Sequence, residues 1–179
     1  MLNGLPEHGS RLNPRTLLQG YRARNSRSTE GETGETVQAL TEFLATFCCA
    51  IFSGAAIYIN AVEHPARMSC GVKVALSEWA PSYRRATVMQ ASLAVLGFVF
   101  SILAWFSGAS VWAPVAGTVL VLVAPFTLVV IMPTNNRLLA LNADRDMDEA
   151  KMLLDRWNRL HMVRSGLGLA ALVIFLVAA

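Results

Sequence analysis

Long runs of uncharged residues, separated by short polar segments, dominate the pattern of this chain. Between Arg85 and Arg137 there is no Asp, Glu, Lys or Arg. A helix needs about 20 apolar residues to cross the hydrocarbon core of a bilayer, so this run is long enough for two crossings. Ser107-Gly108-Ala109-Ser110, near its middle, supplies residues that favour a tight turn. The pattern therefore predicts two membrane helices joined by a short turn.

Two further uncharged segments flank this one, between Glu42 and Glu63 and from Ser165 to the C-terminus. The last segment is short for a crossing, so we expect residues 162–164 to begin within the interface, where long basic side chains can reach the headgroups. The sequence thus predicts an all-α fold, a membrane four-helix bundle. The four helices are expected at residues 37–60, 86–106, 111–132 and 163–179.

An additional amphipathic helix is expected before the fourth crossing, over residues 143–164. Its acidic residues crowd the N-terminal turn, where the helix dipole favours negative charge. Its apolar residues recur at the spacing that places them on one face of a helix. These apolar positions are Ala150, Leu153, Leu154, Trp157 and Leu160.

The first 36 residues have a different composition. They are rich in Ser, Gly, Arg and Glu and contain no apolar run after Met1, so we expect a disordered tail and no cleaved signal peptide. The chain as a whole is 54% hydrophobic and 15% charged, whereas soluble domains average about 25% charged residues. The predicted organisation is therefore a tail at residues 1–36 and a transmembrane domain at residues 37–179.

The unusual polar motifs are predicted to gather at one end of the bundle. Four crossings place residues 61–85 and 133–164 on the same side of the membrane, and the motifs lie in or beside these segments. Ionisable groups at membrane depth are costly and usually functional, so this convergence indicates a site. The motifs are YINAVEHPAR at 58–67, WAPSYRRA at 79–86, MPTNNRLL at 132–139 and WNRLHMVR at 157–164.

Helical spacing adds detail to this predicted site. Trp157, His161 and Arg164 fall on one face of a helix. Because that face is also apolar, His161 and Arg164 should point into the protein. Pro65 should turn the chain near His64, and a proline at 125 should kink the third helix. We therefore predict a ring of polar side chains around a pocket, formed by Asn60, His64, Gln90, Asn135, Asn136 and His161.

The four motifs together resemble those of the anthrone oxygenase family, small membrane proteins of fungal aromatic polyketide pathways. The resemblance covers roughly residues 37–179. It implies the oxidation of a polyketide-derived anthrone to an anthraquinone by molecular oxygen. The residues suit that chemistry, because an anthrone carries an acidic CH₂ group whose deprotonation gives an electron-rich anthrolate that reacts with oxygen directly.

This resemblance leads to expected roles for the polar residues. His161 is the expected base, and His64 is a second base or orients the first. Amide and guanidinium groups would hold the anthrolate oxygen, and aromatic rings would stack on the substrate. The residues expected to hold the anthrolate oxygen are Asn135, Asn136 and Arg67. The remaining expected substrate-binding residues are Asn60, Trp79, Tyr83, Arg84, Gln90, Trp157 and Arg164.

Other interpretations stay open at this point. Glu63, His64 and His161 could bind a metal, or the two histidines could hold a haem. The polar site could also bind a ligand without changing it, as in a scaffold or transporter. The arginines and tryptophans could be interfacial anchors. No nucleotide or flavin fingerprint is present, so we predict no cofactor, with molecular oxygen as the co-substrate.

The predicted partners are the lipid bilayer and an aromatic polyketide, with no nucleic acid. Ten Lys and Arg residues lie in the two motif-bearing segments and five in the tail. The positive-inside tendency therefore places the motif-bearing face in the cytosol. Small residues of the fourth helix could support close contact within the chain or a homo-oligomer. These are Gly166, Gly168, Ala170 and Ala171.

Overall fold

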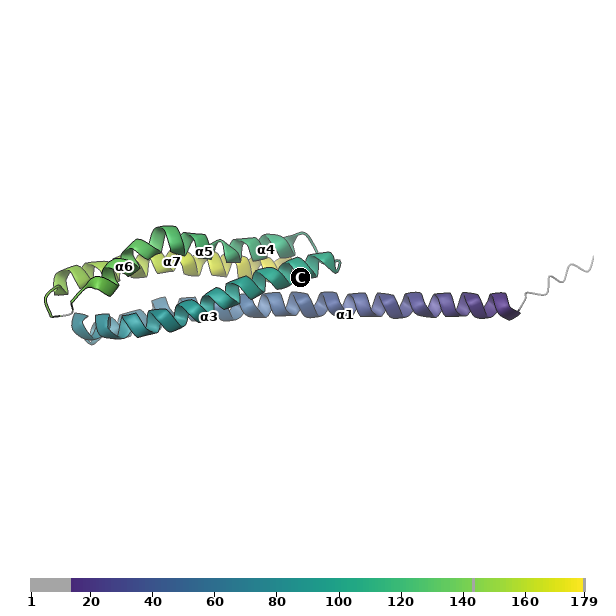
Figure 1. Cartoon of the computed structure of the whole chain (residues 1–179), viewed down its shortest axis with the longest axis horizontal. Helices are drawn as coiled ribbons and strands as arrows, with labels where there is room; N and C mark the ends of the chain where they lie inside the picture. Colours follow the sequence, from purple (N-terminus) through teal and green to yellow (C-terminus); the bar gives the residue numbers. More distant parts are fainter. Residues whose placement is uncertain (1–13, 143, 179) are drawn as a thin grey trace, which may run out of the picture.

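A computed structural model describes residues 14–142 and 144–178, and over these residues the protein is an elongated bundle of helices without strands (Figure 1). The predicted all-α class is confirmed. In chain order the elements are α1 (Pro14–Tyr58), the π-helix η1 (Ile59–Glu63), α2 (His64–Ser69), α3 (Val72–Phe106), α4 (Trp112–Val121), α5 (Val123–Phe126), the π-helix η2 (Thr127–Ile131), α6 (Met132–Ala140) and α7 (Met147–Ala178).

These elements form four antiparallel rods. Within the described residues, four helical stretches are long and apolar enough to cross a membrane: Thr29–Ser69, Val72–Phe106, Trp112–Ala140 and Met147–Val177. The chain reverses at Gly71 and Gly108, whose positive φ angles of 91° and 107° suit glycine. The Gly71 turn and the 141–146 loop lie at one end of the bundle, and the Gly108 turn and the C-terminus lie at the other (Figure 1). The two motif-bearing segments, residues 61–85 and 133–164, thus lie toward the same end of the bundle, as predicted.

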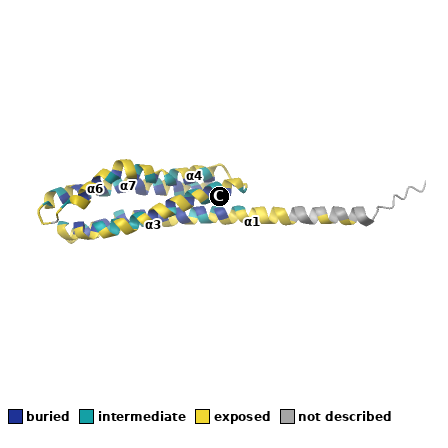
Figure 2. Cartoon of the chain, viewed as in Figure 1, coloured by how far each residue is buried: buried dark blue, intermediate teal, exposed yellow. Residues whose placement is uncertain are grey.

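The surface of the bundle is apolar, as a surface facing lipid would be. Phe106, Val129 and Val177 are all more than 70% exposed, and many other large apolar side chains share that surface (Figure 2). Soluble monomers rarely expose patches of this extent. Inside the bundle, one buried cluster around Phe52 and Leu120 fills the middle. A second cluster, around Trp79 and Trp157, fills the motif-bearing end.

Helix α1 begins well before the predicted first crossing. Residues 14–36, which we expected to be disordered, are helical, and α1 continues as a lone rod beyond the other helices (Figures 1 and 2). Hydropathy missed this segment because residues 29–37 are exposed, so the helix needs no apolar face there. Hydroxyls of Thr33 and Thr36 donate to carbonyls one turn earlier, which is compatible with a solvated helix. Residues 1–13 of the predicted tail lie outside the described residues, and the division into tail and membrane domain stays a prediction.

The expected turn at His64 is wrong. The chain continues as a helix through Pro65 and reverses only at Gly71, because η1 inserts a wide turn just before the proline. In that turn the His64 amide donates to the Ile59 carbonyl, five residues back. The wider spacing accommodates a proline ring, which in a regular α-helix would clash with a carbonyl four residues earlier.

The same arrangement occurs at Pro133. The Met132 amide donates to the Thr127 carbonyl, again five residues back, and α6 then continues to Ala140. The third crossing is thus longer than the predicted 111–132. It is also interrupted at Leu122, between α4 and α5. Pro125 has no N–H group, so it cannot donate the helical hydrogen bond to the carbonyl of Val121. Pro125 was expected to kink the third helix, and this interruption lies three residues before it.

Helix boundaries also differ in the second and fourth crossings. Residues 72–85, expected in a loop, form the first turns of α3, which accommodates Pro81 within it. The amphipathic helix and the fourth crossing form one continuous helix, α7, from Met147 onward. The motif-bearing polar residues therefore lie on extended rigid helices, which position side chains more firmly than loops do.

Candidate active site

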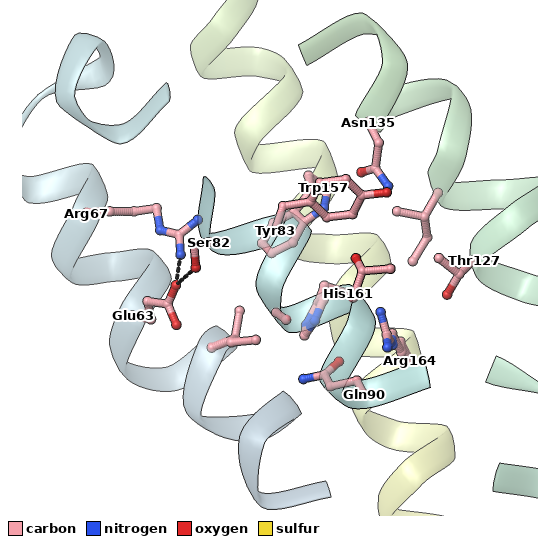
Figure 3. Close-up of a pocket in the computed structure, with 14 residues that line it drawn as sticks. Glu63, Arg67, Ser82, Tyr83, Gln90, Thr127, Asn135, Trp157, His161 and Arg164 are labelled. Carbon is pink, nitrogen blue, oxygen red and sulfur yellow. Dashed lines mark hydrogen bonds and ion pairs between the residues drawn. The ribbon is translucent and has the colours of Figure 1, made fainter. Parts of the chain in front are cut away.

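A narrow cavity lies between the four rods at the motif-bearing end, with about 20 Å³ of space open to a water-sized group (Figure 3). Every rod contributes to its wall, so residues far apart in the sequence meet there. The lining residues are Ile59, Glu63, Arg67, Ser82, Tyr83, Ala86, Thr87, Gln90, Thr127, Ile131, Asn135, Trp157, His161 and Arg164.

His161 is a buried polar group of this cavity with contacts to its neighbours. Its side chain is 3% exposed, and its ring stacks on Trp157 with centroids 4.9 Å apart. Its Nδ1 lies 2.9 Å from Oδ1 of Asn60. The Asn60 amide is itself oriented, because its Nδ2 donates to both the backbone carbonyl and Oδ1 of Asn158, at 3.2 and 2.7 Å. An amide oxygen can only accept, so Nδ1 carries the hydrogen and Nε2 keeps the lone pair.

Asn60 therefore lies behind His161 and does not line the cavity. Its oxygen also accepts a 2.6 Å hydrogen bond from Ser165, whose hydroxyl lies 3.1 Å from the His161 carbonyl as well. Our sequence interpretation gave Asn60 to the substrate and did not single out Ser165 or Asn158. Their spacing in the sequence could have indicated both residues, because each lies about one turn from His161 on α7 and faces the same neighbouring helix.

Arg67 is already paired with carboxylates. It is buried, hydrogen-bonds to Glu63 and lies 2.9 Å from a carboxylate oxygen of Glu78. Ser82 donates a 2.7 Å hydrogen bond to the same Glu63 (Figure 3). The charge of this guanidinium is thus balanced within the protein, which leaves it little capacity for the expected role of holding an anthrolate oxygen.

Arg164 is in the opposite situation. Its side chain is buried, with the residue 8% exposed, and it makes no ion pair with any described residue. Its guanidinium lies 5.3 Å from the centre of the Phe52 ring, and its Nε has no hydrogen-bond partner among the described residues. Nearby, the Gln90 Nε2 also has none. An unbalanced buried cation is costly, so this part of the cavity favours a negatively charged ligand.

The aromatic residues form a stack that continues from the wall into the core. Trp79 and Tyr83 are nearly parallel, with centroids 5.0 Å apart, and Trp79 meets the edge of Trp157 at 5.9 Å. Tyr83 and Trp157 line the cavity, whereas Trp79 is fully buried behind them. Of the three rings expected to stack on a substrate, the structure thus places two at the cavity and one in support.

The two adjacent asparagines of the third crossing face in different directions. Asn135 is fully buried, lines the cavity and has no hydrogen-bond partner for either amide atom among the described residues. Asn136 is exposed, as is Arg84, and neither lines the cavity. Consecutive residues of a helix point about 100° apart, which turns Asn136 away from the cavity that Asn135 lines.

The histidines do not form a metal site with Glu63. His64 is buried, but it packs against Trp157 at 6.0 Å between centroids and does not line the cavity. Within the part of the chain that the structure describes, no three His, Cys, Asp or Glu side chains come together as metal ligands. The donor set of Glu63, His64 and His161 therefore does not fit a three-ligand metal site.

A family model described as Anthrone oxygenase matches residues 79–174, more than half of the chain. The chain belongs to the anthrone oxygenase family. The family match contains the motifs at 79–86, 132–139 and 157–164 and therefore Tyr83, Asn135, His161 and Arg164. The motif at 58–67, with Asn60, precedes it. Comparisons with curated proteins and with solved structures gave no match.

Proposed function

We propose that this member of the anthrone oxygenase family converts an anthrone to an anthraquinone with molecular oxygen, and that His161 is the base. One observation carries the proposal: Asn60 holds Nδ1 of His161 in a buried cavity, so that Nε2 is the nitrogen free to accept a proton. Family membership supplies the substrate class. A neutral imidazole held by its second nitrogen is a common arrangement for a general base.

The reaction needs few participants. His161 takes one proton from the CH₂ group, and the anthrolate passes an electron to oxygen. The two radicals combine in a C–O bond, and the imidazolium returns its proton to give a hydroperoxide. Loss of the remaining proton from the same carbon, with cleavage of the O–O bond, releases water and forms the new carbonyl. Overall, one anthrone and one oxygen molecule give one quinone and one water, so no external reductant is required.

Asn135 is the residue we assign to the developing anthrolate oxygen. Its amide lines the cavity and has no partner among the described residues, so its N–H groups are available as donors. Donors placed in advance where negative charge develops lower the barrier without reorganising during the reaction. Asn136 and Arg67, which we also expected in this role, are respectively exposed and paired with carboxylates.

The flat substrate would lie against Tyr83 and Trp157 at the cavity wall. Aromatic rings offset-stack on such surfaces at little cost in conformational entropy. The cavity space is spread thinly between side chains, so binding an anthrone requires some of them to move apart. The site nevertheless combines an apolar wall, a base and an amide donor, which are the elements that this reaction needs.

The test is oxidation of an anthrone by membranes containing the protein. We expect quinone formation well above the spontaneous rate, one oxygen consumed per quinone, and no hydrogen peroxide released. Membranes with the His161→Ala variant at equal protein level provide the background. Quinone formation no faster than in empty membranes would overturn the proposal and leave a cavity that only binds a ligand. Activity that disappears with a bound metal or chromophore would reject the cofactor-free mechanism.

A further inference from the structure

A second cavity adjoins the first and is lined by different chemistry. It has about 200 Å³ of space between α3 and the α5–η2 segment, and it shares Thr87, Gln90, Thr127 and Arg164 with the site described above. Its remaining lining is almost entirely apolar. These other residues are Phe52, Ala91, Ala94, Val123, Ala124, Leu128 and Met132. We call this second cavity the side groove.

The side groove reaches the lipid-facing surface of the bundle. Ala91 on α3 is exposed and Leu128 on η2 is 63% exposed, and both belong to stretches that can cross a membrane. At its inner end, Phe52 and Ala94 belong to the buried core. An apolar groove thus runs from the surface of stretches that can cross a membrane to residues that also line the cavity containing His161.

Polar groups without partners stand where the two cavities join. Arg164 lines both cavities and is more than nine-tenths buried, and Gln90 lines both as well. The Nε of Arg164 and the Nε2 of Gln90 have no hydrogen-bond partner among the described residues. Thr127 also lines both cavities, but it is neutral and cannot balance the charge of Arg164. Its hydroxyl donates to the Val123 carbonyl at 2.7 Å. A cation and an amide donor at the inner end of an apolar groove are complementary to an apolar molecule with one negatively charged oxygen.

We propose that the side groove is the entry and binding site for an aromatic molecule that carries an ionised acidic oxygen, a carboxylate or phenolate, and that arrives from the bilayer. Its rings occupy the groove before they reach Tyr83 and Trp157, and its charged oxygen pairs with Arg164 and Gln90. The proposal deepens the proposed function, on which it rests for the aromatic class. It assigns to Arg164 the selection of acidic substrates, which is distinct from proton removal by His161.

Binding of a pair of quinone probes tests this without turnover. Anthraquinone-2-carboxylate and its uncharged carboxamide have nearly the same size, and neither can be oxidised as an anthrone. With the protein in lipid nanodiscs, quenching of tryptophan fluorescence reports the affinity of each. We expect the carboxylate to bind at least about tenfold more tightly, which corresponds to roughly 1.4 kcal/mol. Arg164→Gln should remove this preference, and Arg164→Lys should keep part of it.

Matched variants separate local effects from misfolding. Arg85→Gln removes an exposed arginine of α3 and should leave the preference unchanged. Ala91→Trp fills the side groove and should weaken both probes, whereas Val88→Trp, at a 69% exposed position outside the groove, should weaken neither. Thermal melting of each variant in the nanodiscs shows whether it is folded.

Two results would overturn the inference. A folded Arg164→Gln variant that still prefers the carboxylate would show that the charge is recognised elsewhere. Unchanged affinity in a folded Ala91→Trp variant would show that the side groove is not the binding path. If the binding pattern holds while no anthrone is oxidised, the proposed function fails and the inference stands.

Discussion

The pairing of His161 with Asn60 determines which ring nitrogen can act as a base. Nδ1 is engaged at 2.9 Å, so proton abstraction falls to Nε2. We expect His161→Ala to remain in membranes as a folded protein but to lose about 10²–10⁴-fold in the rate of quinone formation. His161→Gln should not recover that loss, because an amide does not accept the proton. Initial rates at equal protein level measure both, and near-wild-type turnover in His161→Ala would refute the assignment.

Asn60 is a positioning residue in this scheme, and its substitution makes a separate prediction. Asn60→Leu keeps a similar volume but removes the acceptor for Nδ1 and the donor to Asn158. Because small displacements of a catalytic group can cost about 10²-fold in rate, we expect kcat to fall by roughly that factor. Asn60→Asp retains an acceptor and should recover much of the rate. A purely structural role would instead predict that Asp and Leu lower kcat and thermal stability together.

Spacing arguments identified the inward residues well where a helix was correctly placed. His161, Arg164 and Trp157 were predicted to share a buried face, and they do. Spacing could not say which of two adjacent residues faces inward without a helical phase, so Asn136 and Arg84 were included although both are exposed. Nor could the sequence show that Arg67 has carboxylate partners while Arg164 has none, because pairing depends on how separate helices pack.

At the scale of elements, the two π-helices set the rotation of the helices on either side. Each adds one residue to a turn directly before a proline-containing helix, η1 before Pro65 and η2 before Pro133. An extra residue rotates the helix before it by about 100° relative to the helix after it. Asn60 lies within η1, so its alignment with His161 depends on that wide turn.

Removing the proline should therefore affect activity more than folding. In Pro65→Ala the regular α-helical hydrogen bond becomes available again, and the wide turn loses one reason to persist. We expect unchanged or higher thermal stability with lower kcat/KM. Pro81→Ala is the matched control, because Pro81 lies within α3 and does not line the cavity around His161. Equal activity in the two variants would argue against a role for the π-turn.

The contact between α1 and α7 depends on a small residue. A Cβ at Gly168 would lie 2.8 Å from the Phe52 ring, whereas at Gly166 it would meet nothing within 4 Å. Overpacking typically costs about 1–3 kcal/mol, so Gly168→Ala should lower the melting temperature in detergent and disturb the ring beneath Arg164. Gly166→Ala should leave it unchanged or raise it. Equal melting temperatures for the two variants would contradict this packing argument. At Gly168, the small residue thus serves packing within the chain.

The number of membrane crossings could be predicted from the sequence, but the ends of the helices could not. Apolar length reports each membrane crossing directly, which is why four were found. Residues 14–36, 72–85 and 133–140 continue helices through polar sequence, where hydropathy carries no signal. Pro65 was expected to end a helix because the sequence shows the missing donor but not the five-residue hydrogen bond that accommodates it.

At the scale of the whole molecule, the motif-bearing end and the C-terminus lie at opposite ends of the bundle (Figure 1). From the excess of Lys and Arg near the first end, we predict that it faces the cytosol. A glycosylation acceptor inserted in the 141–146 loop should then stay unmodified in microsomal membranes, and one added after Ala179 should be glycosylated. The reverse pattern would place the His161 cavity on the lumenal side.

The lone part of α1 extends in the direction away from the cavity. At about 1.5 Å per residue, residues 14–37 would project roughly 35 Å past the bundle. Anything that contacts the far end of this rod is separated from His161 by most of the length of α1, because Asn60, the partner of His161, follows the end of that helix. The free end of α1 is thus remote from the cavity around His161. A tether fixed to that end would leave the side groove unobstructed.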